Sequence, residues 1–389
     1  MRAFVIAVAV LLGALATAEA QYTLQTEYSG NTFFNGFTFF TGSDPTHGFV
    51  DYVDASTASS QGLTQVRNGV VYIFADNTTV ASSAGRRSVR ITSNQSYNSG
   101  LFLFDVNHVP FGCGTWPALW TVGPNWPNSG EIDIFEGVNT QATDLMTLHT
   151  QQGCTMPASR SQTGTTVTSN CWINAPGQSS NQGCGVTNTQ PTSYGDNLNN
   201  AGGGVYATLW NSNGISIWWF QRSAIPSDIR RTPDANFPFG SNCPSSFFVN
   251  HQIVVDLTFC GDWAGNVYSQ FNCPGSSCQN YVQYNPSAFS DAYWSINSFK
   301  VYQPGTPTTT TSTSKTTTTT KATTTSTTAT SSPTSTLVCN AANNGYYYCM
   351  NSGVSQAYEI CNNGAWVSGA CGPGTVCWTS GNSIVCNYP

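Results

Sequence analysis

Charged side chains are scarce in this chain. Aspartate, glutamate, lysine and arginine make up 8% of its 389 residues, and 12 basic against 18 acidic residues give a formal net charge of −6. A nucleic-acid-binding surface needs clustered basic side chains to neutralise phosphates, so nucleic acid is excluded as an expected ligand. Aromatic residues are instead abundant, at 13%. They suit an uncharged carbohydrate, whose sugar rings offer apolar C–H faces.

Long apolar runs are missing after the N-terminus. Residues 1–20 combine Arg2, an apolar run and the small-residue cleavage site Ala18-Glu19-Ala20, a pattern typical of a secretory signal peptide. No later run approaches the roughly 20 apolar residues of a membrane-spanning helix. We therefore expect a secreted, monomeric protein without a membrane segment, located outside the cell or at the cell wall. The sequons at Asn77 and Asn94 are candidate sites of N-glycosylation.

The cysteines divide into two groups. Eight of the 14 lie between Cys113 and Cys278, and six lie between Cys339 and Cys386. Even numbers in a secreted chain indicate disulfide bonds within each group. The spacing does not identify the pairs, because eight cysteines allow about 105 connectivities and six allow about 15.

The segment between the two groups is almost wholly threonine, serine, proline, alanine and lysine. Such a composition cannot bury a core, stays extended and is typical of a linker that carries O-linked sugar. The sequence therefore predicts a large domain at residues 21–303, a linker at 304–336 and a small cysteine-rich domain at 337–389.

Helical periodicity is scarce in the large domain. Short β-branched and aromatic runs separated by turn residues predict strands instead, at residues 70–75, 88–92, 101–106, 132–136, 145–150, 205–210, 215–220, 252–259 and 295–302. The tetrapeptide Asn211-Ser212-Asn213-Gly214 predicts a hairpin. An all-β fold follows, with a single antiparallel β-sandwich favoured over two smaller domains. A concave face on one sheet would hold a polymer.

Three acidic residues stand close together at Glu131, Asp133 and Glu136, within six consecutive positions. On a helix they would point in divergent directions. On a strand Glu131 and Asp133 share a face, and an extra residue near Ile134 or Phe135 would form a β-bulge that brings Glu136 to the same face.

Two carboxyl groups on one face, about 5 Å apart, suit a retaining glycosidase. One attacks the sugar carbon and the other protonates the leaving oxygen, while Asp133 keeps their protonation states apart. The residues alone do not say which glutamate attacks. An acidic edge strand and part of a calcium site are the alternatives. The flanking glycines and the apolar residues between the acids argue against an acidic edge, and calcium loops prefer alternating Asp, Asn and Gly in a turn.

The octapeptide GEIDIFEG at residues 130–137 resembles the signature of glycoside hydrolase family 16. Similar segments are DPTHG at 44–48, GCGTWPA at 112–118, MTLHT at 146–150 and FCGDWAG at 259–265. Together they resemble the fungal secreted endo-β-1,3(4)-glucanases, or laminarinases. The resemblance implies a β-jelly roll with an open concave cleft, Glu131 as nucleophile, Glu136 as general acid and then base, and Asp133 as support for Glu131. The chemistry needs no cofactor and no residue is assigned to a metal, while a bound calcium ion is left open.

The same resemblance suggests residues that bind substrate. Trp120 and Trp126 match positions that flank the family's cleft, although the stretch between them is one residue shorter here. Trp263, in a polar loop, is the third expected stacking residue. His149, on the strand after the acids, is expected to face the acid pair. Asn139, just after the acid strand, is a further candidate.

Other residues are expected to have no part in the site. Most single tryptophans lie in a core, and we expect this of Trp116, Trp218 and Trp219. Asp144 and the remaining acids are expected to be solvated charges in loops.

The small domain has too few residues to fold on an apolar core alone, so disulfides must hold it. Its seven tyrosines and tryptophans are more than such an interior can hide. The segments YEICNNGAWV at 358–367 and CGPGTVC at 371–377 resemble the chitin-binding carbohydrate-binding module family 19. That implies binding to chitin or another wall polysaccharide. A protein contact and a purely stabilising role are the alternatives.

Three functions are compatible with these features. The first is an endo-acting, retaining hydrolase of β-1,3 and mixed β-1,3/1,4 glucans. The second is a transglycosylase that joins wall glucan to another polymer, such as chitin. The third is a wall-binding lectin without activity, but a lectin has no use for clustered carboxylates. The hydrolase is the interpretation that the residues favour.

Overall fold

The structure is a computed structural model that describes residues 22–305 and, farther along, residues 347–349, 355, 357–362, 365–371, 376–380 and 383–387. The predicted signal peptide and almost all of the predicted linker lie outside the described residues. The chain divides into two compact units, Met1–Thr310 and Thr311–Pro389. In the described part of the chain, no helix has the length and apolar character needed to cross a membrane.

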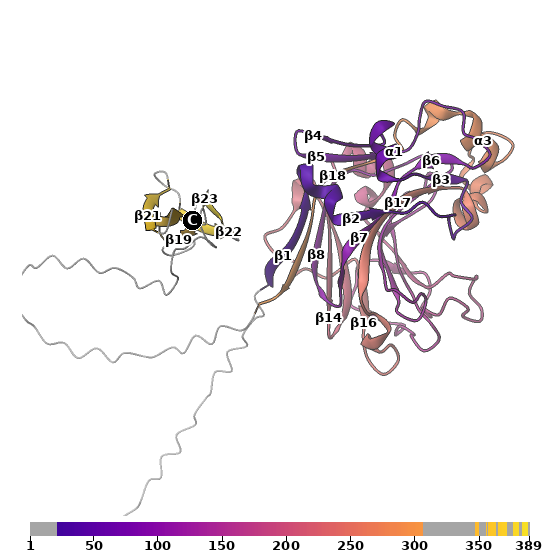
Figure 1. Cartoon of the computed structure of the whole chain (residues 1–389). Helices are drawn as coiled ribbons and strands as arrows, with labels where there is room; N and C mark the ends of the chain where they lie inside the picture. Colours follow the sequence, from indigo (N-terminus) through magenta and orange to yellow (C-terminus); the bar gives the residue numbers. More distant parts are fainter. Residues whose placement is uncertain are drawn as a thin grey trace, which may run out of the picture. The chain divides into compact units, whose positions relative to one another are not determined.

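The first unit contains two large antiparallel sheets (Figure 1). One has eight strands in the order β16-β15-β14-β8-β18-β5-β4, with β1 also paired to β18. Its strands are β1 (Tyr22–Ser29), β4 (Thr64–Arg67), β5 (Val70–Phe74), β8 (Gly100–His108), β14 (Gly204–Asn211), β15 (Gly214–Gln221), β16 (Ala235–Pro238) and β18 (Tyr293–Pro304).

The second sheet also has eight strands, in the order β12-β13-β11-β10-β9-β17-β7-β2. Its strands are β2 (Phe37–Phe39), β7 (Arg90–Tyr97), β9 (Thr115–Val122), β10 (Glu131–Glu136), β11 (Leu145–His149), β12 (Thr165–Thr166), β13 (Cys184–Thr187) and β17 (His251–Phe259). The acid strand β10 is therefore an interior strand of this sheet, held on both sides.

Shorter elements connect the strands. They are the parallel pair β3 (Val50–Tyr52) and β6 (Arg86–Ser88), the helices α1 (Ala55–Ser60), α2 (Gly195–Asn200) and α3 (Cys278–Tyr284), and the helical turns η1 (Gly30–Gly36), η2 (Pro191–Ser193), η3 (Arg222–Ala224), η4 (Ser245–Phe247), η5 (Gly261–Gly265), η6 (Tyr268–Phe271) and η7 (Pro286–Phe289).

The two sheets share one apolar core. Burial alternates along β8, which turns Phe102 and Phe104 inward. Residues of the second sheet, including Ile132 and Leu148, belong to the same buried cluster. This packing is the β-sandwich that the sequence predicts, and it leaves the other face of β10 free of the core.

The four disulfide bonds of this unit are Cys113–Cys273, Cys154–Cys243, Cys171–Cys184 and Cys260–Cys278. The eight cysteines of the large domain thus pair among themselves, as their even number predicts.

All nine predicted strands are present, although the one expected at 88–92 is split between β6 and β7. The predicted hairpin joins β14 to β15, with Asn211 opposite Gly214. The sequence interpretation missed eight of the strands described in this unit, namely β1, β2, β3, β4, β9, β12, β13 and β16. Of these, β9 contains Pro117, and proline is rare inside central strands. The pairing of β9 with β10 ends at Ala118. Pro117 lies one residue beyond this end, so β10 needs no N–H from it.

In the second unit, β19 (Tyr347–Cys349), β20 (Ala357–Asn362) and β21 (Ala365–Ala370) form one sheet, and β22 (Val376–Ser380) pairs with β23 (Ser383–Asn387). A disulfide joins Cys349 to Cys377. The described part of the cysteine-rich segment is therefore a small disulfide-linked β structure.

Candidate active site

The pairing of β10 with β9 contains a β-bulge. The register shifts between Asp133 and Phe135, so Ile134 has no partner on β9. The partners of Glu131, Asp133 and Glu136 are alternate β9 residues, namely Val122, Trp120 and Ala118. All three acids therefore lie on the same face of the sheet, opposite the core. This confirms the bulge that the sequence predicts.

His149 lies beside the acids from the neighbouring strand. On β11 it pairs with Glu131, and its Nε2 lies 3.1 Å from Asp133 Oδ2. Both side chains are buried, with 7% of His149 and 3% of Asp133 exposed. Burial lowers the pKa of His149, but Asp133 and then the two glutamates outweigh it and raise that pKa to about 9. His149 is thus an imidazolium at neutral pH, paired with Asp133.

Each glutamate has its own indole donor. Trp126 Nε1 donates to Glu131 Oε2, and Trp116 Nε1 donates to Glu136 Oε1 over 2.8 Å. Trp126 keeps 43% of its surface exposed. Trp116 makes an edge contact with Trp263, with ring centroids 5.7 Å apart. The expected position of Trp116 in the core is therefore wrong, since β9 alternation places it on the acid face.

The two glutamates differ in their protonation. Burial, followed by the charge of Asp133, raises the pKa of Glu131 to about 7, against the lowering effects of His149, Trp126 and Arg90. The same two causes raise the pKa of Glu136 well above its ordinary value, although Trp116 opposes them. Glu131 therefore loses its proton around pH 7, while the raised pKa of Glu136 favours its protonated form. A retaining glycosidase needs this difference.

Trp120 lies on the same face, opposite Asp133, and is partly exposed. The Arg90 guanidinium is 4.9 Å from the Trp120 ring centroid and 4.8 Å from that of Phe40. Arg90 also forms an ion pair of 3.8 Å with Asp256. These contacts fix the Trp120 ring, which lies on the same face of β9 as Trp116.

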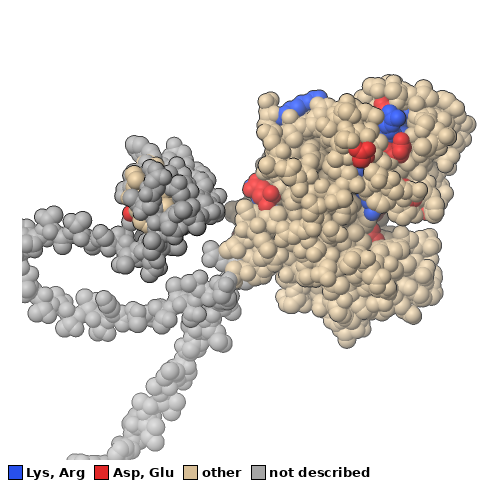
Figure 2. Space-filling model, in the orientation of Figure 1, with Lys and Arg blue, Asp and Glu red and all other residues tan. Residues whose placement is uncertain are grey.

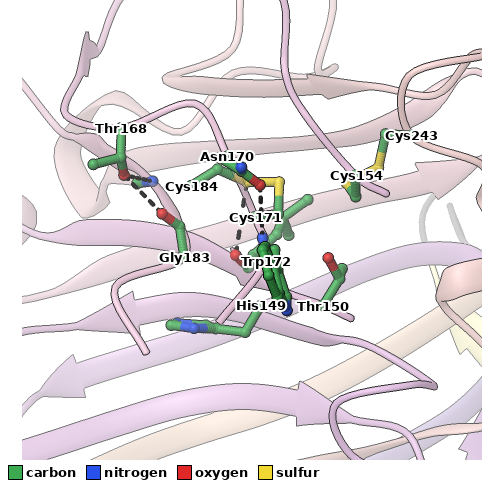
Figure 3. Close-up of a disulfide and its surroundings, with 12 residues drawn as sticks. His149, Thr150, Cys154, Thr168, Asn170, Cys171, Trp172, Gly183, Cys184 and Cys243 are labelled. Atoms are coloured by element: carbon green, nitrogen blue, oxygen red, sulfur yellow. Dashed lines mark hydrogen bonds between the residues drawn. A yellow bond between two sulfur atoms is a disulfide. The ribbon is translucent and has the colours of Figure 1, made fainter. Parts of the chain in front are cut away.

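A disulfide-bonded segment lies beside His149 (Figure 3). Cys184, on the strand next to β11, is bonded to Cys171, and Trp172 follows in the same segment. Gly183 is required here: its φ is +64°, and a Cβ on it would lie 2.9 Å from His149 Cε1. Trp172, which the sequence interpretation did not single out, is partly exposed near the end of β11.

Asn139 does not contact the face that bears the acids. It is fully buried, accepts from the Gly114 N–H over 2.8 Å and donates to the Ala264 carbonyl over 3.0 Å. The expected contact of Asn139 with substrate is therefore wrong. Its side chain has a structural role, because it holds the loop of Trp263 against the start of β9.

Asp144 is not a solvated charge. It is fully buried, and its Oδ1 accepts from the backbone N–H of Glu136 over 2.9 Å. Trp218 and Trp219 do lie in the interior, with 4% and 0% exposed. No sequence spacing singles out Asp144, but its place directly before β11 puts it next to the acid strand.

Charged side chains are sparse and scattered on the face shown in Figure 2, as the composition predicts. Among the described residues, no group of three or more histidine, cysteine, aspartate or glutamate side chains is arranged to hold a metal ion. The side chains brought together at the site are carboxyl groups, one imidazolium and indole rings.

A family model decides the relationship. The model of the XgeA-like, catalytic GH16 domain matches residues 37–302, which include every residue of the site. The chain belongs to this family. Its sandwich of two antiparallel sheets agrees with this assignment.

Two curated relatives illustrate the similarity. A probable glycosidase of Schizosaccharomyces pombe is 48% identical over 67% of this chain and 64% of its own length. An endo-1,3(4)-beta-glucanase of Arthroderma benhamiae is 44% identical over 77% of this chain and 69% of its own length. The chain therefore spans about two thirds of the length of these relatives.

Two solved GH16 structures have the same fold. Laminarinase 16A from Phanerochaete chrysosporium, with two beta-glucans in its donor and acceptor sites, is 44% identical, with a TM-score of 0.69 over 72% of this chain and 99% of its own. An elongating GH16 beta-1,3-glucosyltransferase is 42% identical, with a TM-score of 0.69 over 73% of this chain and 100% of its own. They confirm the predicted antiparallel β-sandwich of jelly-roll type.

Proposed function

We propose that this chain is a retaining endo-β-glucanase that hydrolyses β-1,3 and mixed β-1,3/1,4 glucans. One observation carries the proposal: two glutamates on one strand face, Glu131 and Glu136, have separate indole donors and different protonation. The GH16 family and the curated relative named endo-1,3(4)-beta-glucanase support the substrate class.

The reaction proceeds by double displacement. A carboxylate oxygen of Glu131 attacks the anomeric carbon as the glycosidic C–O bond breaks, and Glu136 gives its proton to the departing oxygen. Glu136, now a carboxylate, then takes a proton from water. The water oxygen attacks the same carbon and the bond to Glu131 breaks, which restores both groups and retains the configuration.

Two neighbours support the nucleophile. Asp133 and His149 form an ion pair beside Glu131, and the imidazolium lowers the pKa of Glu131 and so favours its carboxylate form. Trp120, Trp126 and Trp263 supply ring faces for sugars on the same side of the sheet as the acids.

Product analysis tests this function. The full chain is incubated with laminarin, lichenan and cellulose, and the product sizes are followed with time. Rapid appearance of oligosaccharides of mixed length from laminarin and lichenan is expected. Release of glucose alone from chain ends would contradict the endo mode, and unchanged polymers would contradict hydrolysis and favour a lectin.

Transfer to sugar is the second candidate function. The observation that favours it is the 42% identity to an elongating beta-1,3-glucosyltransferase of the same fold. Both outcomes use the same covalent intermediate, and they differ in whether water or a sugar hydroxyl attacks it. Products longer than a defined laminarin oligosaccharide, formed at high substrate concentration, would identify transfer.

We also propose that residues 1–20 direct secretion, that 304–336 form a glycosylated linker, and that 337–389 bind chitin or another wall polysaccharide. Tethering would raise the local enzyme concentration at an insoluble surface. A chain truncated after residue 303 should keep its activity on soluble laminarin and lose retention on chitin or insoluble glucan. Unchanged retention on both would overturn the binding role.

A further inference from the structure

Asp144 is a buried acid that the double displacement does not use. It precedes β11 and has 0% of its surface exposed. Its backbone is anchored twice, since its N–H donates to Ser193 Oγ over 3.1 Å and its carbonyl accepts from the Asn188 N–H over 2.9 Å. The position of this side chain is therefore well determined by the fold.

The side chain of Asp144 forms a hydrogen bond that strand pairing does not supply. The pairing of β10 with β11 ends at Asp133 opposite Thr147, because the bulge follows. Glu136 lies beyond that end, so its N–H has no partner on β11. The Oδ1 of Asp144 accepts this N–H over 2.9 Å. The Asp144 side chain thus holds the backbone of Glu136, the proposed general acid, at a position where β11 provides no pairing partner.

The surroundings of Asp144 disfavour a negative charge. The ionisable groups that act on it are Glu136 and Asp133 from β10, and Asp234, which lies just before β16. The phenols of Tyr194 and Tyr206 are its other titratable neighbours. Within the described residues its Oδ2 has no hydrogen-bond partner. A buried carboxylate without a cation is costly, whereas the neutral acid is not.

The direction of its pKa agrees with this geometry. Burial raises the pKa of Asp144 well above its ordinary value, the Glu136 N–H opposes that effect, and the charges of Glu136, Asp234 and Asp133 add to it. Burial and the neighbouring acids therefore both favour the neutral form of Asp144.

We infer that Asp144 is a positioning residue that, as a neutral carboxylic acid, holds the backbone of Glu136 without placing a second negative charge beside it. This inference rests on the proposed role of Glu136. A neutral acceptor fixes the geometry of the acid, whereas a carboxylate at the same place would also repel the Glu136 carboxylate that forms in the first step.

Two substitutions separate position from charge. Asp144→Asn keeps the carbonyl acceptor and stays neutral, so kcat on laminarin should remain within about threefold, with an unchanged basic limb of the pH profile. Asp144→Ala removes the acceptor and should lower kcat roughly 10- to 100-fold with little change in KM. If Asp144 were ionised, Asp144→Asn would lower the pKa of Glu136 and move the basic limb to lower pH, which would overturn the inference.

Asp44→Ala is the matched control. Asp44 is also buried, at 9% exposed, also accepts a backbone N–H, that of Gly48 over 3.2 Å, and is not among the charges that act on Asp144. Its loss should lower the melting temperature without a selective loss of kcat. If Asp144→Ala behaves like this control, Asp144 is merely structural and the inference is wrong.

Two readouts separate this inference from the proposed function. With an activated aryl laminaribioside, whose leaving group needs no proton, azide should restore turnover in Asp144→Ala, because azide needs no general base. The infrared difference spectrum between the full chain and Asp144→Asn near neutral pH should show the loss of one protonated-carboxyl band, distinct from the band that is lost in Glu136→Gln. If no such band is lost in Asp144→Asn, the neutral acid is overturned even if Glu136 is catalytic, whereas an active Glu136→Gln overturns the proposed function even if the Asp144 band is present.

Discussion

His149 Nε2 lies 3.1 Å from Asp133 Oδ2. This ion pair places a positive charge beside the two glutamates, which an isolated cluster of carboxyl groups would lack. Three acids on one strand face would repel one another strongly if all were ionised. The imidazolium offsets part of this negative charge beside Glu131. Asp144 adds a hydrogen bond from the backbone N–H of Glu136.

The two glutamates should be indispensable and not interchangeable. Glu136→Gln should lower kcat on laminarin roughly 10²- to 10⁴-fold through loss of proton transfer, and Glu131→Gln should abolish the covalent step. Calorimetry should still detect binding of laminari-oligosaccharides to both variants. Glu27→Gln is the control, since Glu27 is exposed on β1 and paired only with Lys300 at 3.7 Å. Near-normal turnover of either active-site variant would contradict the assignment.

The two indole donors should act on opposite limbs of the pH profile. Trp126→Phe removes a bond that lowers the pKa of Glu131, so the acid limb of kcat/KM should move up by about one pH unit. Trp116→Phe removes the bond that lowers the pKa of Glu136, so the basic limb should move up instead. The ring face is kept in both variants. A shift of the same limb in both would show that the donors are not specific.

His149 should act on both limbs together. Its positive charge lowers the pKa of Glu131 and of Glu136, so His149→Asn should shift the whole bell-shaped profile to higher pH. The profile is measured with soluble laminarin. His108→Asn is a suitable control, because His108 is half-buried on the other large sheet and stacks on Tyr293. An unshifted profile would mean that His149 is neutral at the site.

Local patterns in the sequence predict ten of the 18 strands described in the first unit, and the bulge in β10. The spacing of Glu131, Asp133 and Glu136 requires an extra residue in a strand, and the register at Ile134 contains it. Successive side chains of any strand point to opposite faces, so this period of two can be recognised in the sequence before the fold is known.

Contacts that depend on register were not predictable in the same way. Trp116 reaches Glu136 only because β9 pairs with β10, and Pro117 concealed that strand. Asn139 has a left-handed φ of 52°, and its amide is hydrogen-bonded to Gly114 and Ala264. No spacing in the sequence indicates either feature. Asp144 depends on where the β10–β11 ladder ends. These roles arise from pairing between segments rather than from composition.

The raised pKa of Glu131 also predicts a pH dependence of stability. The folded value is about 7, against an ordinary 4.5. Between these values the native state binds more protons than the unfolded chain, so the free energy of unfolding should fall as pH rises through this window. Glutamine cannot lose a proton, and Glu131→Gln should therefore exceed the native chain in stability above the folded pKa while differing little below the unfolded one.

Urea unfolding of both proteins at about pH 4 and about pH 8 measures the effect. Glu27→Gln, on the exposed side of β1, should show no such pH-dependent gain. A gain of equal size at both pH values would mean that it comes from packing rather than from ionisation. In that case the folded pKa of Glu131 is not raised, and the acid limb of activity should lie near the ordinary carboxyl value. A gain confined to the higher pH, with activity lost, means that Glu131 is held in a position that favours catalysis over stability.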